Sequence, residues 1–276
     1  MRAIILLLSL ASLCQAGAQR IVSTAPSITE TLFAMGLGSH VVGVTIYCKY
    51  PPEAQKLPKI GTFLNPDAEA IVALRPDLVV VEKNLNRLPE QLTQLHVRHI
   101  EFESLNLDTL YAGIHEIGKA AEARAAADRL IDEMQFAFQD IRQRTSGLPE
   151  PTVAILVGRT GNRLEGLIAG AGNSYFSDLI NAAHGKNIFA DSPVPYPTIP
   201  LEEFLLRNPD FILELSSENG EHRKAVKEAW SSQPFLRAVA SGHIYPLPPE
   251  LFLVPGPRAV DAVRMLAHML HPDLRP

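Results

Sequence analysis

The sequence predicts an α/β protein with two Rossmann-like lobes, each built on a mainly parallel sheet, joined by a long connector helix. Short β-branched runs alternate with amphipathic helical stretches in both halves, a pattern typical of parallel sheets covered by helices. Between the halves, residues 108–145 contain no proline and repeat apolar residues at helical spacing. One helix–strand unit also occurs once in each half.

The first half begins with an expected strand at 20–24 and a helix that Gly36 ends. Ser27 and Glu30 have the spacing of a capping box, in which both side chains bond to free N–H groups at a helix start. We therefore expect the pair to open this helix. The remaining expected elements of this half are strands at 41–45, 78–81 and 99–102 and helices at 67–74 and 89–95.

The second half repeats the theme, with expected strands at 152–157, 211–215 and 243–247 and helices at 174–183, 201–206, 221–231 and 257–270. The connector should break near 118–122, and its second part, about 22 residues, would span ~33 Å. A rod of that length would cross between lobes; the alternative is a surface helix of a single domain. The predicted organisation is a signal peptide at 1–18, lobes at 19–107 and 147–276, and the connector at 108–146.

The repeated unit runs from Glu69 to Asp77 in the first half and from Glu202 to Asp210 in the second. In each copy a glutamate opens a short helix, a proline follows seven residues later, and an aspartate leads into an apolar strand. The repeat indicates two lobes of similar build. The alternative is that such units recur by chance in any α/β protein.

The N-terminus has one positive charge followed by an apolar run too short to span a bilayer, which is typical of a signal peptide. Ala16-Gly17-Ala18 is a suitable cleavage site, so we expect a periplasmic chain beginning near Gln19. The alternative is a lipid anchor on Cys14, although Leu13 is bulky for the residue before such a cysteine. Cleavage would leave Cys48 as the single thiol, without an internal disulfide.

Several function classes are disfavoured. A formal net charge of -5 without a basic cluster argues against a nucleic-acid partner. Gly170-Ala-Gly172 begins like a dinucleotide loop, but Tyr175 stands where the third glycine belongs. The close histidine pairs, His96 with His99 and His268 with His271, do not make a metal site, and a buried thiol is the expected state of Cys48. We expect no enzyme, since an exported α/β hydrolase would need a nucleophile beside a base.

Aromatic residues are placed informatively in turns. Tyr47, Tyr50, Phe63 and Tyr196 each flank a turn marked by proline or glycine. These turns follow the carboxyl ends of strands or join elements, where open α/β sheets bind ligands. Rings from two lobes would clamp a broad, flat ligand, a large organic molecule or a metal chelate. The alternative is that each ring caps its own core.

With these residues in place, the sequence resembles the helical-hinge class (class III) of periplasmic solute-binding proteins, which serve ABC importers of cobalamin, haem and ferric siderophores. It is most similar to the cobalamin-binding members. The resemblance covers nearly the whole mature chain, and its specific segments are 20–30, 42–52, 61–63, 69–77, 187–191 and 194–197.

The resemblance implies a rigid connector, small lobe movements and no chemistry on the ligand. It implies that Tyr47, Phe63 and Tyr196 pack on a corrin ring whose edge meets an acid near Glu250. It also implies that Glu69 and Glu202 meet arginines of the two permease subunits. The cobalamin binders have tryptophans where this chain has Phe63, Tyr196 and Glu82, which leaves room for another corrinoid or a cationic or hydroxylated chelate.

The expected function is the periplasmic substrate-binding component of an ABC importer, a monomer that captures cobalamin or a related corrinoid and delivers it to the permease. The alternative is a ferric-siderophore or haem binder of the same class, for which Arg159, just after the first strand of the second half, would meet an anionic ligand. The expected ligand-binding residues are Tyr47, Tyr50, Phe63, Glu82, Arg159, Tyr196 and Glu250, with no cofactor besides the ligand.

Overall fold

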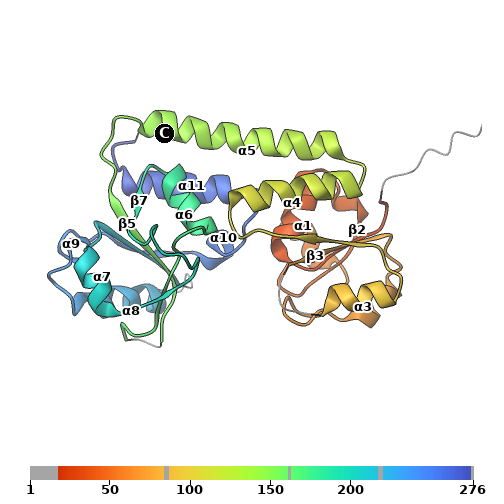
Figure 1. Cartoon of the computed structure of the whole chain (residues 1–276), viewed down its shortest axis with the longest axis horizontal. Coiled ribbons are helices and arrows are strands. Elements are labelled where there is room, and N and C mark those ends of the chain that lie inside the picture. The colour runs from red at the N-terminus through yellow and green to blue at the C-terminus, as the bar shows by residue number, and fades with distance from the viewer. Residues whose placement is uncertain (1–17, 84–86, 161–162, 217–219, 275–276) are drawn as a thin grey trace, which may run out of the picture.

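A computed structural model describes residues 18–83, 87–160, 163–216 and 220–274, without the side chains of 220–223. The described chain forms two lobes lying side by side, with a long helix running over both (Figure 1). This confirms the predicted two-lobe α/β fold. Residues 1–17, with nearly all of the expected signal peptide and Cys14, lie outside the described residues. None of the described helices is long and apolar enough to cross a membrane.

The N-terminal lobe contains a four-stranded parallel sheet in the order β2-β1-β3-β4. Alternate residues of β3 pack on opposite faces, with Val79 and Val81 in one cluster and Leu78 and Val80 in the other. The elements are β1 (Ile21–Ser23), α1 (Pro26–Ala34), β2 (Val41–Val44), α2 (Ala68–Ala73), β3 (Leu78–Glu82), α3 (Leu88–Gln94) and β4 (His99–Phe102), with 3₁₀ turns at Gly38–His40 and Pro52–Lys56.

The C-terminal lobe contains a six-stranded mixed sheet in the order β10-β9-β5-β6-β8, with β7 paired to β5. Its antiparallel strands β6 (Leu167–Ala169) and β8 (Thr198–Ile199) are absent from the sequence prediction because runs of two or three residues carry no periodic signal. The other elements are β5 (Thr152–Gly158), α6 (Tyr175–Ala182), β7 (Lys186–Asn187), α7 (Leu201–Arg207), β9 (Phe211–Leu215), α8 (Gly220–Ser231), α9 (Arg237–Ala240), β10 (Ile244–Leu247), α10 (Pro249–Phe252) and α11 (Ala259–Leu270).

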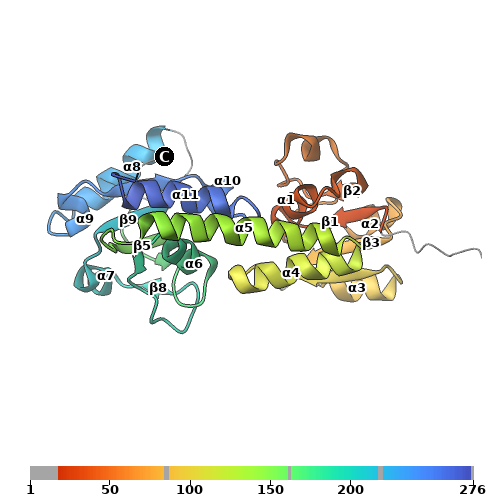
Figure 2. The ribbon, with the colours of Figure 1, turned by 90° about the horizontal axis from the view of Figure 1, so that it is seen from above.

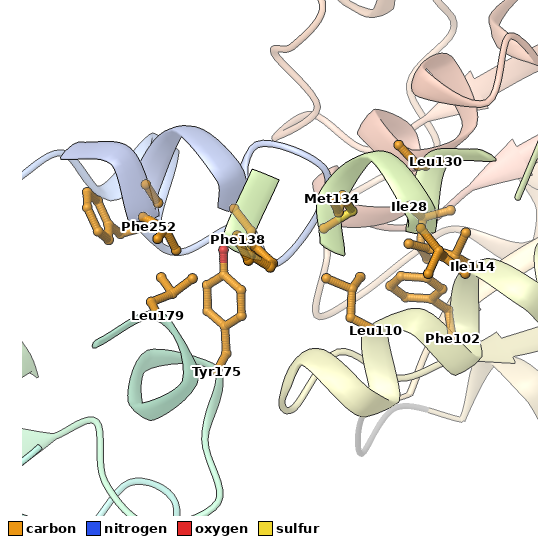
Figure 3. Packing of buried hydrophobic residues seen from close by; sticks show 14 of the residues in the cluster. Ile28, Phe102, Leu110, Ile114, Leu130, Met134, Phe138, Tyr175, Leu179 and Phe252 are labelled. Atoms are coloured by element: carbon orange, nitrogen blue, oxygen red, sulfur yellow. The ribbon is translucent and has the colours of Figure 1, made fainter. Parts of the chain in front are cut away.

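The connector is two helices, α4 (Leu107–Ala120) and α5 (Arg124–Thr145), and the break lies where the sequence predicts it. Glu122 turns the chain with a φ of 56°. Helix α5 contacts α4, α6 and α11, so its buried face joins the cores of both lobes (Figures 2 and 3). Such a continuous apolar seam resists bending at the junction. The lobe and connector boundaries 19–107, 108–146 and 147–276 stay a prediction.

The two copies of the repeated unit are alike in three dimensions. Residues Arg75 and Asn208, each just before the proline, have left-handed φ angles of 48° and 43°. The aspartates that follow, Asp77 and Asp210, each accept a backbone N–H from the first strand region of their lobe, at 3.1 Å from Arg20 and 2.8 Å from Thr152. The same local sequence therefore makes the same joint twice.

The predicted capping box at the start of α1 is wrong. The helix begins at Pro26, and its N-cap residue, Ala25, makes no side-chain cap. Proline at the first helical position supplies the right φ and has no N–H to satisfy. The side chains of Ser27 and Glu30 bond instead to residues far along the chain.

Candidate ligand-binding site

An ion pair ties the two lobes together. Glu30 of α1 and Arg258, which precedes α11, form two hydrogen bonds, from Nε to Oε2 at 2.7 Å and from Nη2 to Oε1 at 2.5 Å. Burial raises the pKa of the Glu30 carboxyl, and the Arg258 hydrogen bonds oppose that rise. The same bonds raise the pKa of Arg258. Because the pair is charged, bidentate and mostly buried, it fixes the orientation of Arg258.

The fixed arginine supports an exposed tyrosine. The guanidinium carbon of Arg258 lies 4.4 Å from the ring centroid of Tyr50, a cation–π contact. The side chains of Tyr47 and Tyr50 are 52% and 48% exposed, whereas Cys48 between them is buried. Thr29 donates a hydrogen bond to the Cys48 sulfur, which confirms a buried thiol. The loop thus turns two aromatic rings outward.

A ladder of rings supports the exposed tyrosine of the other lobe. Tyr196, 39% exposed, makes an edge contact with Phe176, which makes another with the fully buried Tyr175. Tyr175 lies beside Phe138 of the connector helix (Figure 3), and its hydroxyl has no hydrogen-bond partner among the described residues. Burial raises the pKa of this hydroxyl far above its ordinary value. The ladder holds Tyr196 against the junction of the lobes.

Polar contacts close the base of the junction. The backbone N–H of Tyr175 donates to the carbonyl of Leu105 at 2.6 Å. Asn106 donates to Asn173 at 2.6 Å, and the carboxylate of Asp178 accepts the N–H of Leu107 at 2.8 Å. These bonds seat the start of α4 on the start of α6.

Glu82 is the last residue of strand β3 in the N-terminal lobe. Its two carboxylate oxygens accept hydrogen bonds from the hydroxyls of Ser27 and Ser104, each at 2.9 Å. Burial raises the pKa of Glu82 to about 7, although both serine hydrogen bonds act to lower it. No described residue forms an ion pair with this carboxylate.

Other predicted ligand-binding residues lie in different surroundings. Arg159 follows β5, but its side chain is only 7% exposed and bonds to Glu214 at 2.7 Å. Phe63 is half-buried against the main core. Glu250 is exposed, and its carbonyl accepts a hydrogen bond from Arg258. The junction therefore gathers Tyr50, Glu250 and Arg258, and the ligand roles of the predicted set stay predictions.

The predicted docking glutamates are both exposed. Glu69 and Glu202 occupy the second position of α2 and α7, one in each lobe. Among the described residues, no group of three His, Cys, Asp or Glu side chains has the geometry of a metal site. His271 is buried and its Nε2 lies 3.1 Å from the carbonyl of Ala183.

Sequence reasoning missed the residues that hold the exposed ones. Glu30 was assigned to a helix cap, and Arg258 lies 228 residues away from it. Ser104 belongs to no motif, and Tyr175 stands out in the sequence only because it occupies the place of a third glycine. Nothing in the local pattern signals these contacts, since each depends on how the two lobes meet.

Residues 21–251 match the sequence model of a family described as Periplasmic binding protein. The chain is 31% identical over 255 residues to the Vitamin B12-binding protein of Vibrio cholerae serotype O1, over 92% of this chain and 89% of that protein. It is 30% identical over 265 residues to the Uncharacterized ABC transporter substrate-binding lipoprotein YvrC of Bacillus subtilis (strain 168), over 92% of this chain and 81% of that protein.

The fold is similar to the crystal structure of the periplasmic vitamin B12 binding protein BtuF of Vibrio cholerae, with a TM-score of 0.77 and 27% sequence identity. The similarity covers 94% of this chain and 99% of that chain. These matches agree with the class expected from the sequence motifs.

Proposed function

This chain belongs to the periplasmic binding protein family, and we propose that it captures cobalamin or a related corrinoid between its lobes and delivers it to an ABC importer. The observation that carries the proposal is the 31% identity, along 92% of the chain, with a vitamin B12-binding protein. The family is one of binding proteins, which agrees with the prediction that the chain is not an enzyme.

The arrangement of rings supports a broad, flat ligand. Tyr50 belongs to one lobe and Tyr196 to the other, and each is about half exposed while its support is buried or fixed. A macrocycle offers two apolar faces, which suit two rings presented from opposite sides. The proposed ligand contacts are these two tyrosines with Tyr47, Phe63, Glu82 and Glu250.

The test is equilibrium dialysis of the purified chain against cyanocobalamin, haem and a ferric siderophore, with the ligand measured by its absorbance. We expect cyanocobalamin to be retained at one equivalent, as for a single site between two lobes. Retention of haem or the ferric siderophore in its place would overturn the corrinoid assignment and support the alternative within the same family.

The family places the chain outside the cytoplasm, and the finer proposal is a cleaved signal peptide without an anchor. Mass spectrometry of the exported protein should find an unmodified chain beginning near Gln19. A lipid on Cys14 would overturn this proposal. The Bacillus subtilis relative is named a lipoprotein, so the measurement decides between two processing routes.

The proposed partner is the permease pair of an importer, with Glu69 and Glu202 as docking residues. Both are exposed and occupy matching positions of the repeated unit. A two-fold permease would meet one glutamate from each lobe. We propose that the chain acts as a monomer without a nucleic-acid partner.

A further inference from the structure

Three segments of the N-terminal lobe converge on Glu82. The sheet order β2-β1-β3-β4 places β1 beside β3, and ligands of open sheets bind where strand order reverses, at the carboxyl ends. Ser27 follows β1 and Ser104 follows β4, and each donates its hydroxyl to a different oxygen of Glu82. The backbone N–H of Glu82 donates to Thr24 at 3.0 Å. The carboxylate is thus fixed in one orientation.

This fixed carboxylate lies at the junction of the lobes. Gly256 of the C-terminal lobe lies so close to Ser27 that an added Cβ would be 3.6 Å from the Ser27 carbonyl oxygen. The residue after Ser104, Leu105, accepts the backbone N–H of Tyr175. Both serines therefore adjoin the opposite lobe, and Glu82 lies between them.

Glu82 has no ion-pair partner among the described residues. The arginines near the carboxyl ends of the strands are already committed, Arg258 to Glu30 and Arg159 to Glu214. The neighbouring Lys83 pairs with Glu103 at 3.0 Å on the surface. Residues 84–86, outside the described chain, contain no cation by sequence, and the next residue, Arg87, is exposed and forms no ion pair with Glu82. Among the described residues no cation pairs with Glu82, so above pH 7 its carboxylate carries a negative charge without an ion-pair partner.

We propose that Glu82, held by Ser27 and Ser104, selects corrinoids with amide side chains over corrinoids with carboxylate side chains. The inference rests on the proposed function and names the chemistry of the ligand edge. A carboxylate has about four acceptor positions, and the serines use two, so two can accept N–H groups from a ligand amide. Above pH 7, where Glu82 is ionised, a ligand carboxylate would place a like charge against this part-buried group, which is unfavourable.

The experiment compares cyanocobalamin with its monocarboxylates, in which one peripheral propionamide is hydrolysed to propionate. Affinities are measured by titration calorimetry at pH 8 for the wild type, Glu82→Gln and the control Glu103→Gln. The control removes the same charge from a neighbouring side chain that is 40% exposed and paired with Lys83. Circular dichroism and thermal melting verify that each variant is folded.

Of the separated monocarboxylates, we expect the one that the wild type binds most weakly to bind at least about tenfold more weakly than cyanocobalamin. Glu82→Gln should reduce this preference to less than about threefold, and Glu103→Gln should keep it. Equal preferences in the wild type and Glu82→Gln would overturn the inference alone. Failure of every protein to bind cyanocobalamin would overturn the proposed function together with the inference.

Discussion

Two glutamates on equivalent strands of the two lobes have different surroundings. Glu214 of β9 follows the aspartate of its repeat by four residues, and Glu82 of β3 follows its own by five. Side chains alternate between faces along a strand, so this offset turns them to different sides. Glu214 is buried and bonds to Arg159 at 2.7 Å and to Trp230 at 2.9 Å. Glu82 has two hydroxyl partners and, among the described residues, no ion-pair partner.

The difference separates a structural acid from one available to a ligand. All the strong partners of Glu214 come from its own lobe, so its charge is neutralised whether or not a ligand is present. Glu82 is held firmly but not neutralised, which is the arrangement expected of a group whose final partner comes from outside the chain. The strand that follows each copy of the repeated unit thus carries a structural ion pair in one lobe and a candidate recognition group in the other.

Removing the partner of the structural acid should have the largest effect. Arg159→Met would leave Glu214 buried without its cation, and we expect the free energy of unfolding to fall by about 3–5 kcal/mol. Urea denaturation followed by circular dichroism measures the change. The matched control is Arg163→Met, since that side chain is 81% exposed. A similar small change in both variants would contradict the structural role of Arg159.

The free energy of unfolding should depend on pH through Glu82. The pKa of Glu82 is raised from 4.5 to about 7, so the folded state holds this proton more tightly than the unfolded state does. Stability from this group is present below pH 4.5 and is lost as pH rises to about 7, by up to about 3 kcal/mol. Glu82→Gln should remove that loss, so it should be more stable than the wild type at pH 8.

Urea unfolding of the two proteins between pH 5 and pH 8 measures this difference. Glu103→Gln serves as the control for removing a nearby charge. A constant difference between wild type and Glu82→Gln across the whole pH range would contradict the burial argument.

Removing either exposed tyrosine ring should cause a moderate loss of affinity for cyanocobalamin. Tyr50→Ala and Tyr196→Ala should each weaken cyanocobalamin binding by about tenfold, equivalent to about 1.4 kcal/mol, because each removes one stacking surface. Phe136→Ala is the control, an aromatic residue of α5 that is 73% exposed. Calorimetric titration compares the three. Unchanged affinity in both tyrosine variants would place the ligand elsewhere.

The docking glutamates should matter least for the isolated protein. Glu69→Lys with Glu202→Lys should leave cyanocobalamin affinity within about twofold, since both residues lie away from the junction. Uptake by cells should nevertheless fall, because like charges would face each other at the permease. The control is Glu133→Lys, an exposed acid of α5. Normal uptake by the double variant at normal protein levels would leave both glutamates only the role of complementing their helix dipoles.

Local sequence signals account for most of the fold. Gly36 ends α1 with a φ of 79°, as the sequence predicts, and Asp67 and Ser174 cap α2 and α6 within three residues of themselves. The connector and the repeated unit follow from periodicity and proline placement in the same way. In each case the partner atoms lie within a few residues, so the pattern itself contains the interaction.

The candidate site depends on contacts that the pattern does not contain. Tyr50 and Tyr196 are recognisable as loop aromatics, but nothing near them in sequence tells that Arg258 and Phe176 support them. Arg159 is recognisable as an arginine that follows a strand, but nothing near it in sequence tells that Glu214 lies beside it. Burial and pairing are properties of the assembled lobes.

The start of α1 shows the division most clearly. By itself the sequence determined that a helix begins there, because Pro26 presets the backbone and the apolar period follows. Only the tertiary structure decided what Ser27 and Glu30 do, since Glu82 and Arg258 lie 55 and 228 residues away. A cap on a helix terminus is a modest gain that water can replace, whereas a buried carboxylate or guanidinium left without a partner is costly. The distant partners therefore win, and they do so only once both lobes have folded.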